Sequence, residues 1–242
     1  MKAAIMLVSC CVVGLAATGC AVTPDLAPPA DAGGKQWVAV SAMGNRARLQ
    51  HIGTTVFNNV VTHVDASGWR LDGHIESLVE RQRPALQWVK TEISHDVREG
   101  FSRIGLDGLS RMADSGRRKA SMDALRNACA CEFAVIVSPA QWGDDISNTS
   151  ASLTGYGVHQ RGFIGAPDYA RAFVSLQVTL VDLRKGEETG SYRTSRIDSL
   201  PFRLSKERKL IPEPAEFSHI ENAIKSMIGP VLNYGMGTLP QR

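Results

Sequence analysis

Residues 173–183, FVSLQVTLVDL, alternate apolar and polar side chains over the length of a full strand. Successive side chains of a strand point to opposite sides, so one face of this segment is apolar. That face is formed by Val174, Leu176, Val178 and Leu180. Residues 186–188, GEE, supply a turn, and residues 189–198 return as a second strand. The sequence therefore predicts a long β-hairpin in the second half of the chain.

Other strand-like segments lie earlier in the chain. Residues 133–137, within EFAVIVSP, form a continuous apolar run, which is typical of a central strand covered on both faces. Residues 36–41 and 49–57 read as strands around the turn sequence Met43-Gly44-Asn45, so we expect them to form a hairpin. Residues 86–94, LQWVKTEIS, follow a proline and contain β-branched residues, which favours a strand. A helix is the alternative there, because its spacing is also fitted by Leu86, Val89, Ile93 and Val97.

Three segments have helical periodicity. Residues 71–82 place apolar side chains three and four positions apart, and Pro84 follows them as a stop signal. Residues 117–128 read as a second helix, while residues 105–116 before them read as a loop or short turn. Residues 213–232 carry a long amphipathic pattern and predict a C-terminal helix.

Composition limits both the fold class and the function. Of the 242 residues, 43% are hydrophobic and 21% are charged, as in ordinary folded proteins. The sequence has no internal repeat, so residues 36–242 are predicted to form a single α/β (α+β) domain, with a mixed sheet of five or six strands packed by about three helices. A formal net charge of +3 does not support the dense basic face that nucleic acid binding needs, so nucleic acid is not an expected partner.

Residues 1–19 are predicted to be a signal peptide. One positive residue, Lys2, precedes a mostly apolar run over residues 3–17, and small residues follow this run. The run is shorter than the ~20 apolar residues that a helix needs to cross a bilayer. We therefore expect export of the chain and no membrane-spanning helix at this position.

The end of this segment, GLAATGC at residues 14–20, resembles the lipobox of bacterial lipoproteins. The resemblance implies cleavage before Cys20 and attachment of a lipid to its thiol. The sequence departs from the family pattern at Ala17, where the family prefers leucine. Ordinary secretion, with residues 17–19 as the cleavage site, is the alternative.

Residues 20–35 are rich in Pro, Ala and Gly and read as a lipidated tether. Two or three acyl chains on Cys20 would hold the protein firmly to a membrane, whereas a single chain binds reversibly. The residue after the cysteine is Ala21 and not the Asp that commonly retains such lipoproteins at the inner membrane. In a double-membrane bacterium we therefore expect the protein to be anchored at the periplasmic face of the outer membrane.

The long segment between the predicted strands, residues 139–169, lacks periodicity and reads as a loop. Loops of this length are uncommon and are usually functional or disordered. Its candidate recognition side chains are Trp142, Asp144, Asp145, Tyr156, His159 and Arg161. The alternative interpretation is a mobile excursion that makes few contacts with the domain.

Cysteine and histidine patterns show no catalytic or metal-binding signature. Cys129 and Cys131 form a C-x-C pair, which we interpret as two small buried thiols, because a bridge between residues two apart departs from usual disulfide geometry. No His or Cys follows at zinc-like spacing, and the histidines form no H-x-x-x-H motif. We expect no cofactor, no metal and no enzymatic activity, while a triad assembled from distant residues stays open.

A small basic cluster precedes the last predicted helix. Its members, within FRLSKERKL, are Arg203, Lys206, Arg208 and Lys209. Such a cluster is usually a solvated loop, but in a lipid-anchored domain it can contact anionic headgroups or another envelope polymer.

Two stretches resemble a group of small envelope domains. EFAVIVSP (132–139) matches an apolar strand, and VTLVDLRKGEETGSYR (178–193) matches a strand and hairpin return, of the TolB N-terminal domain and the CsgG and LpoB lipoproteins. The resemblance implies a protein that works by contact with its partners. The predicted function is a membrane-anchored periplasmic module that binds another envelope protein or a cell-wall polymer in cell-envelope assembly or maintenance. The alternatives are an envelope hydrolase that uses residues 139–169 and a purely structural or stress-associated lipoprotein.

Overall fold

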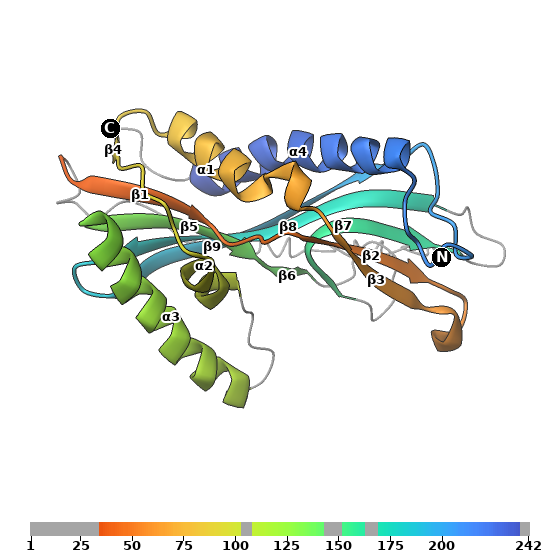
Figure 1. The fold of residues 1–242 in the computed structure, drawn as a ribbon, viewed down its shortest axis with the longest axis horizontal. Helices are drawn as coiled ribbons and strands as arrows, with labels where there is room; N and C mark the ends of the chain where they lie inside the picture. Colours follow the sequence, from red (N-terminus) through yellow and green to blue (C-terminus); the bar gives the residue numbers. More distant parts are fainter. Residues whose placement is uncertain (1–33, 103–107, 143–151, 163–168, 238–242) are drawn as a thin grey trace, which may run out of the picture.

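The computed structural model describes residues 34–102, 108–142, 152–162 and 169–237, which form one α/β domain (Figure 1). Its strands are β1 (Gln36–Ser41), β2 (Arg46–Ile52), β3 (Val60–Asp65), β4 (Gln87–Trp88), β5 (Phe133–Pro139), β6 (Gln141–Trp142), β7 (Leu153–Arg161), β8 (Tyr169–Asp182) and β9 (Glu187–Ser199). Its helices are α1 (Leu71–Gln82), α2 (His95–Ser102), α3 (Gly108–Cys129) and α4 (Pro214–Gly237), with 3-10 turns η1 (Val56–Asn58) and η2 (Ser67–Trp69). All nine strands belong to one mixed sheet.

β8 organises this sheet, because two strands share one of its edges. β9 pairs antiparallel with β8 from Arg171 to Asp182 and occupies one edge. On the other edge, β7 pairs with the first half of β8, from Tyr169 to Ser175, and β5 pairs with the second half, from Leu176 to Asp182. β5 and β7 therefore lie end to end along β8.

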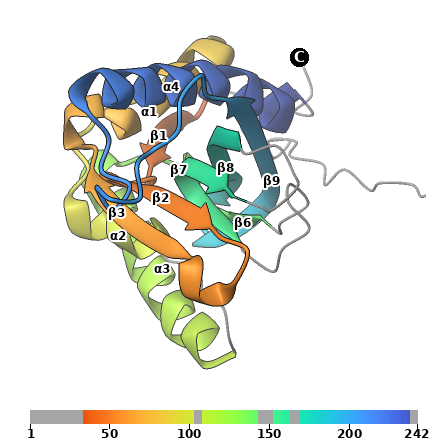
Figure 2. The same ribbon diagram turned by 90° about the vertical axis from the view of Figure 1, so that its right-hand side faces the viewer.

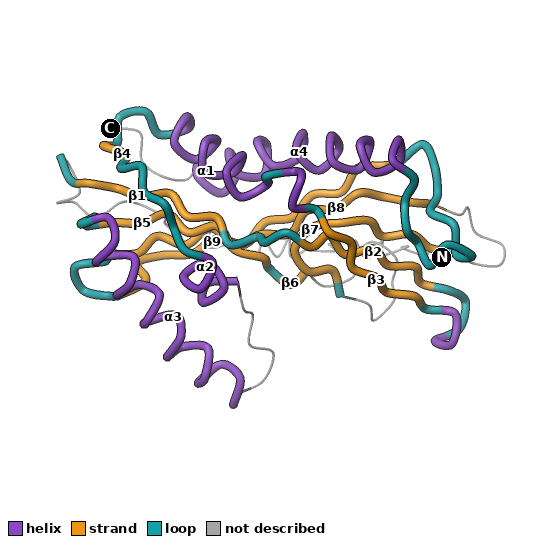
Figure 3. Tube along the Cα trace, viewed as in Figure 1, coloured by secondary structure: helices purple, strands orange, loops and turns teal. Residues whose placement is uncertain are grey.

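β1 and β2 repeat this arrangement one position further out. β1 runs parallel to β5, and β2 runs parallel to β7. Figure 3 shows β1, a short loop and β2 following one another along the length of the molecule. The hairpin predicted from residues 36–57 is therefore wrong, because these two strands pair with different partners and not with each other.

Side chains from the helices explain why the chain continues straight at this point. The Asp72 carboxylate accepts hydrogen bonds from the Met43 backbone N–H at 3.0 Å and from the Ser41 hydroxyl at 2.6 Å. The Glu76 carboxylate accepts the Ser41 backbone N–H at 2.9 Å and pairs with Arg98. These bonds satisfy backbone groups that lack a strand partner, so the chain can pass from β1 to β2 without a turn.

Helices cover the two faces of the sheet unequally. α1 and α4 lie together on one face, and α2 and α3 lie on the other, from which α3 projects (Figures 1 and 2). The core under α1 and α4 includes residues from β1, β2, β5, β7 and β8. The core under α2 and α3 draws its strand residues from β1, β5 and the end of β8. The β2 and β7 half of the second face thus contributes nothing to the apolar core described there.

Several local predictions are confirmed. The predicted hairpin is formed by β8 and β9, and the apolar run at residues 133–137 is β5, paired on both edges. The helices predicted at 71–82 and 213–232 are α1 and α4, and the one predicted at 117–128 is the second half of α3. The hairpin and the helices have strong periodicity of their own, and β5 is a continuous apolar run, so each carries a local signal in the sequence.

Three other local predictions are wrong. Residues 86–94 form a strand only at Gln87–Trp88, and the apolar spacing that continues beyond them belongs to α2, which begins at His95. α3 already begins at Gly108, within the predicted loop at 105–116; an internal glycine costs a helix about 1 kcal/mol relative to alanine but does not end it. The sheet also has nine strands and not five or six, since β3, the two-residue β6 and the longer β7 were not predicted.

The predicted loop at 139–169 also differs from the structure. Its residues 153–161 form β7, a strand inside the sheet with buried side chains from Gly155 to Gln160. The sequence LTGYGVHQR conceals this strand because glycines and buried polar residues occupy one of its faces, which removes the apolar alternation. A segment read as an excursion is therefore part of the sheet.

The C-x-C pair also differs from its interpretation as two thiols. Cys129 and Cys131 are joined in a disulfide. Ala130 between them adopts a left-handed conformation, with φ of 50°, at the end of α3. This turn brings the two sulfur atoms to the same side of the chain.

Candidate functional site

The six residues predicted as a recognition site do not form a single cluster. Asp144 and Asp145 lie outside the described residues, as does Cys20. Trp142 is half-buried in β6, which pairs with the start of β7. The other three predicted residues lie on β7, where side chains alternate between the two faces of the sheet.

Tyr156 is a core residue. Its side chain is 2% exposed and lies on the face covered by α1 and α4, 5.9 Å from the ring of Trp69. Its hydroxyl donates a hydrogen bond to the Gly44 carbonyl at 2.8 Å, which ties β7 to the loop between β1 and β2. Burial, followed by the charges of Asp72 and Asp65, raises the pKa of Tyr156 far above its usual value. Tyr156 therefore stays neutral and has a structural role.

His159 points to the opposite face and takes part in a buried chain of hydrogen bonds. Arg48 donates from Nε to Gln50 Oε1 at 2.9 Å, and the amide nitrogen of Gln50 lies 2.8 Å from His159 Nδ1. Because the amide oxygen already faces Arg48, the NH2 group must donate to Nδ1, which leaves the ring proton on Nε2. Arg48 thus selects the tautomer of His159 through Gln50.

A second glutamine and histidine pair lies on the other face of the same two strands. Gln160 contacts His51 Nδ1 at 3.3 Å and binds the backbone of Leu204 at both ends of its amide, with two hydrogen bonds of 2.9 Å. All three side chains are buried. This amide anchors the segment before α4 to the sheet.

Two arginines near His159 lack acidic partners. Arg171 lies directly opposite His159 in the pairing of β7 with β8, and its guanidinium carbon lies 4.4 Å from the centre of the Tyr169 ring. Among the residues that the structure describes, neither Arg48 nor Arg171 forms an ion pair. The Tyr169 hydroxyl oxygen is buried and has no hydrogen-bond partner in the part of the chain that the structure describes; an unsatisfied buried hydroxyl costs roughly 1–3 kcal/mol.

We call this group the basic patch. Its members share the face of β2, β3, β7 and β8 that points away from α1 and α4, and they are Arg48, His63, His159, Tyr169 and Arg171. Arg48, Tyr169 and Arg171 are half-buried, and His63 is exposed. The patch is therefore in partial contact with solvent through its arginines and through His63.

The electrostatics of the patch are those of uncompensated positive charge. Burial lowers the pKa of Arg48, and no attractive charge offsets that effect. Burial and then the charges of Arg48 and Arg46 lower the pKa of His63. A neutral His63 and two partly desolvated guanidinium groups give a surface that favours an anion.

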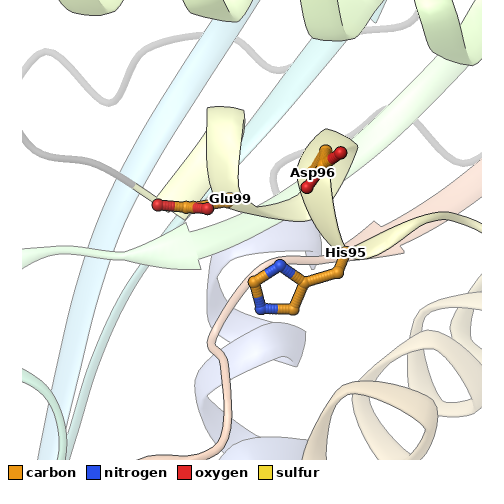
Figure 4. Close-up of side chains that lie close together, drawn as sticks. All are labelled: His95, Asp96 and Glu99. Carbon is orange, nitrogen blue, oxygen red and sulfur yellow. The ribbon is translucent and has the colours of Figure 1, made fainter.

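A groove of about 390 Å³ between α2 and α3 is a second candidate. It is lined in part by Asp96, Glu99 and Arg117. His95, Asp96 and Glu99 lie near one another on the first turns of α2, with potential ligand atoms within 4.8 Å (Figure 4). All three side chains are exposed, and exposed acidic groups of this kind are common on proteins that bind no metal. The cluster alone does not define a metal site.

The basic cluster at residues 203–209 is partly neutralised. Arg208 pairs with Glu213 at 2.6 Å and with Glu216 at 3.3 Å. Lys206 and Lys209 are exposed. The loop is held against β3 by a hydrogen bond from the Thr62 hydroxyl to the Lys209 carbonyl at 2.9 Å. This cluster is thus a packed loop with two exposed lysines.

Sequence reasoning found His159 but missed the residues around it. Gln50 lies on a predicted strand and Arg48 directly precedes that strand, but no motif distinguishes either residue. Tyr169 and Arg171 lie far from both in the sequence. The available signal was the run of polar residues in RARLQH, which is unusual for a strand bordered by strands on both sides. That signal carries information only once β2 is known to be internal.

Within the described residues, none of the helices is both long and apolar enough to cross a membrane. No protein-family model and no curated protein matches the chain. Solved structures with partial similarity include lipoprotein GNA1162 from Neisseria meningitidis, which is 12% identical over 81% of this chain and 99% of that one, with a TM-score of 0.32.

Two further structures show the same degree of similarity. The hypothetical protein CT253 from Chlamydia trachomatis is 14% identical over 83% of this chain and 99% of that chain, with a TM-score of 0.31. Protein XCC0632 from Xanthomonas campestris, of the family DUF330, is 9% identical over 88% of this chain and 90% of that chain, with a TM-score of 0.32. The similar structures thus include a lipoprotein, and scores this low carry no inference about ligand or activity.

Proposed function

We propose that the protein is a lipid-anchored module of the bacterial cell envelope that binds another envelope component through the basic patch. In this proposal Cys20 carries the lipid, residues 20–35 form the tether, and the domain faces the periplasm at the outer membrane. The role is assembly or maintenance of the envelope by contact, with no chemical step.

One observation carries the binding role. Arg48 is partly desolvated on a face of the sheet that forms no apolar core with α2 or α3, and no described carboxylate pairs with it. Holding a charge in such a place lowers stability unless a partner compensates it. A bound component that brings negative charge would supply that compensation.

The hydrogen bonds of the patch support a binding role. Nδ1 of His159 lies 2.8 Å from the amide nitrogen of Gln50, and the oxygen of that amide accepts a hydrogen bond from Arg48. The network therefore fixes the position and tautomer of the ring, as expected of a recognition surface.

In-cell crosslinking tests this proposal. A photoreactive amino acid is placed at His63, which is exposed beside Arg48, and in a control at Arg81, which is exposed at the end of α1. We expect adducts from position 63 that Arg48→Gln reduces at least fivefold. Equal adducts from both positions, or adducts insensitive to Arg48→Gln, would refute the patch as the binding surface.

The anchor is tested separately. Cys20→Ala should leave the protein unacylated and release it into the soluble periplasmic fraction, because no lipid then holds it. Membrane fractionation and the mass of the N-terminal peptide measure this. Membrane association of the variant with an unchanged precursor mass would contradict the lipid anchor. The role of the basic patch would then still be decided by the crosslinking experiment.

A further inference from the structure

We infer that the basic patch binds a phosphate group, held by Arg48, Arg171 and the hydroxyl of Tyr169. This inference rests on the proposed function, because it assigns the chemistry of the ligand at the same surface.

The three donors lie on one face of the sheet, on β2 and β8, in three successive rows of paired residues. Gln50 lies opposite His159, and His159 lies opposite Arg171, so these three residues form one row across β2, β7 and β8. Arg48 is two residues before Gln50 on the same face and leans toward this row, because its Nε bonds to Gln50. Tyr169 is two residues before Arg171, and the two side chains are stacked.

The donor groups have unused capacity. Arg48 donates one hydrogen bond, from Nε, and Arg171 contacts the Tyr169 ring. The Tyr169 hydroxyl oxygen is buried and has no hydrogen-bond partner among the described residues. A guanidinium carries five N–H donors, so both arginines retain donors for an external anion. The stacking on Tyr169 holds the plane of one guanidinium in place before binding.

Gly157 lies within the basic patch and has no side chain. It lies directly opposite Arg48 in the parallel pairing and shares this face of the sheet. A Cβ at this position would overlap the Arg48 carbonyl, so the close approach of the two strands requires glycine. Gly157 therefore adds no side chain of its own to the patch beside Arg48.

A tetrahedral oxyanion fits these donors better than a carboxylate does. Arg48 approaches from β2, while Arg171 and Tyr169 approach from β8 on the other side of β7. A phosphate group offers oxygens in several directions, whereas a carboxylate offers two in one plane. Burial and the charges of Arg48 and Arg46 lower the pKa of His63, and the negative charge of a bound anion acts on that pKa in the opposite direction.

The test is calorimetric titration of the full-length protein in detergent with inorganic phosphate, against sodium chloride at equal ionic strength. We expect saturable heat with phosphate and at least a tenfold weaker affinity in Arg48→Gln and in Arg171→Gln. The matched control is Arg193→Gln, because Arg193 also donates from Nε to a glutamine, Gln177, at 3.0 Å but is exposed on β9. The control should bind like the wild type. Unfolding curves identify any variant that fails to fold, and the second arginine variant then decides.

A second titrant distinguishes the source of the phosphate. Glycerophosphoglycerol is the soluble headgroup of phosphatidylglycerol and is a diester, unlike inorganic phosphate. Tighter binding of the diester identifies a lipid headgroup, and tighter binding of inorganic phosphate identifies a free phosphate or monoester. Either result supports the inference. Absence of saturable heat with both titrants, or equal affinity in Arg48→Gln and wild type, overturns it. If crosslinks at position 63 still depend on Arg48 in that case, the binding function stands with a different ligand.

Discussion

The two halves of the sheet have the same strand arrangement and opposite chemistry. On the face toward α2 and α3, the half built from β1 and β5 carries buried apolar residues, namely Val38, Val40, Ala134 and Ile136. The same face of the other half, built from β2 and β7, carries Arg48, Gln50, Gly157 and His159. In the first half these residues pack against two helices. In the second half they form hydrogen bonds with one another.

This difference separates stability from recognition. Apolar burial contributes about 25 cal/mol per Å2 removed from water, so the first half is where the fold gains free energy. Buried polar groups contribute little net stability even when each finds a partner. A half that keeps arginine, glutamine and histidine on such a face is therefore better explained by what it binds. Four measurements test this difference between the two halves of the sheet.

The largest effect is expected in the apolar half. Ile136 is completely buried between β5 and the helices, so Ile136→Ala should lower the free energy of unfolding by about 2–5 kcal/mol. Chemical denaturation measures this. Ile197→Ala, at a half-exposed position of β9, is the control and should cost much less. Equal losses in the two variants would mean that this half is no more important to stability than the edge of the sheet.

The next effect is expected where the two polar strands approach most closely. Gly157→Ala places a Cβ against the Arg48 carbonyl and should cost about 1–3 kcal/mol, because β2 and β7 must separate or strain. Gly73→Ala is the control, since its Cβ would lie in open space on α1 and alanine is the better helix former. We expect opposite signs for the two variants in thermal unfolding. A neutral Gly157→Ala would show that the close strand contact is not required.

A smaller effect tests the tie between the two halves. Tyr156→Phe removes the hydrogen bond to the Gly44 carbonyl but keeps the buried ring, and should cost about 1 kcal/mol. Tyr156→Ala should lower the free energy of unfolding far more, because it also removes the buried ring. A loss of binding in Tyr156→Ala would therefore say nothing about recognition. Unfolding curves of the two variants would contradict this assignment if both matched the wild type.

The smallest effect is a change of proton affinity. The pKa of His63 should lie below 6.5 in the native protein, so the native state binds fewer protons there than the unfolded state. Stability from this group is therefore present above the unfolded pKa and decreases as the pH falls through it. Arg48→Gln should raise the His63 pKa by removing one of its causes, as measured by NMR titration. An unchanged pKa in this variant would mean that the charge of Arg48 has no part in lowering it.

The elements that were predicted correctly have a common property. They are α1, α4, β5 and the hairpin of β8 and β9. Each of them shows its apolar pattern within one continuous segment, and the apolar side chains of that segment pack in the core. The elements that were missed do not. β7 contains two glycines and buried polar side chains, and β3 is a short strand at one side of the sheet.

The candidate site was less accessible to sequence reasoning than the fold. His159 was identified, but Gln50, its hydrogen-bond partner, lies 109 positions away in the chain. Tyr156 was placed beside it in the same prediction, although neighbouring positions of different parity in a strand face opposite sides. Which residues share a face of β7 became known only when β7 was known to be a strand.

The α/β class, the long hairpin and the helices at residues 71–82 and 213–232 could be predicted from the sequence, because local periodicity requires no knowledge of the partner. That β1 and β2 lie end to end, and that Arg48, His159 and Arg171 share one face, is known only from the tertiary structure. The physical reason is that β1 and β2 pair with strands far away in the chain, because Trp37 pairs with Phe133 and Arg48 pairs with Gly157. Carboxylates from α1 bind the backbone where β1 ends, and the chain therefore continues straight instead of folding back.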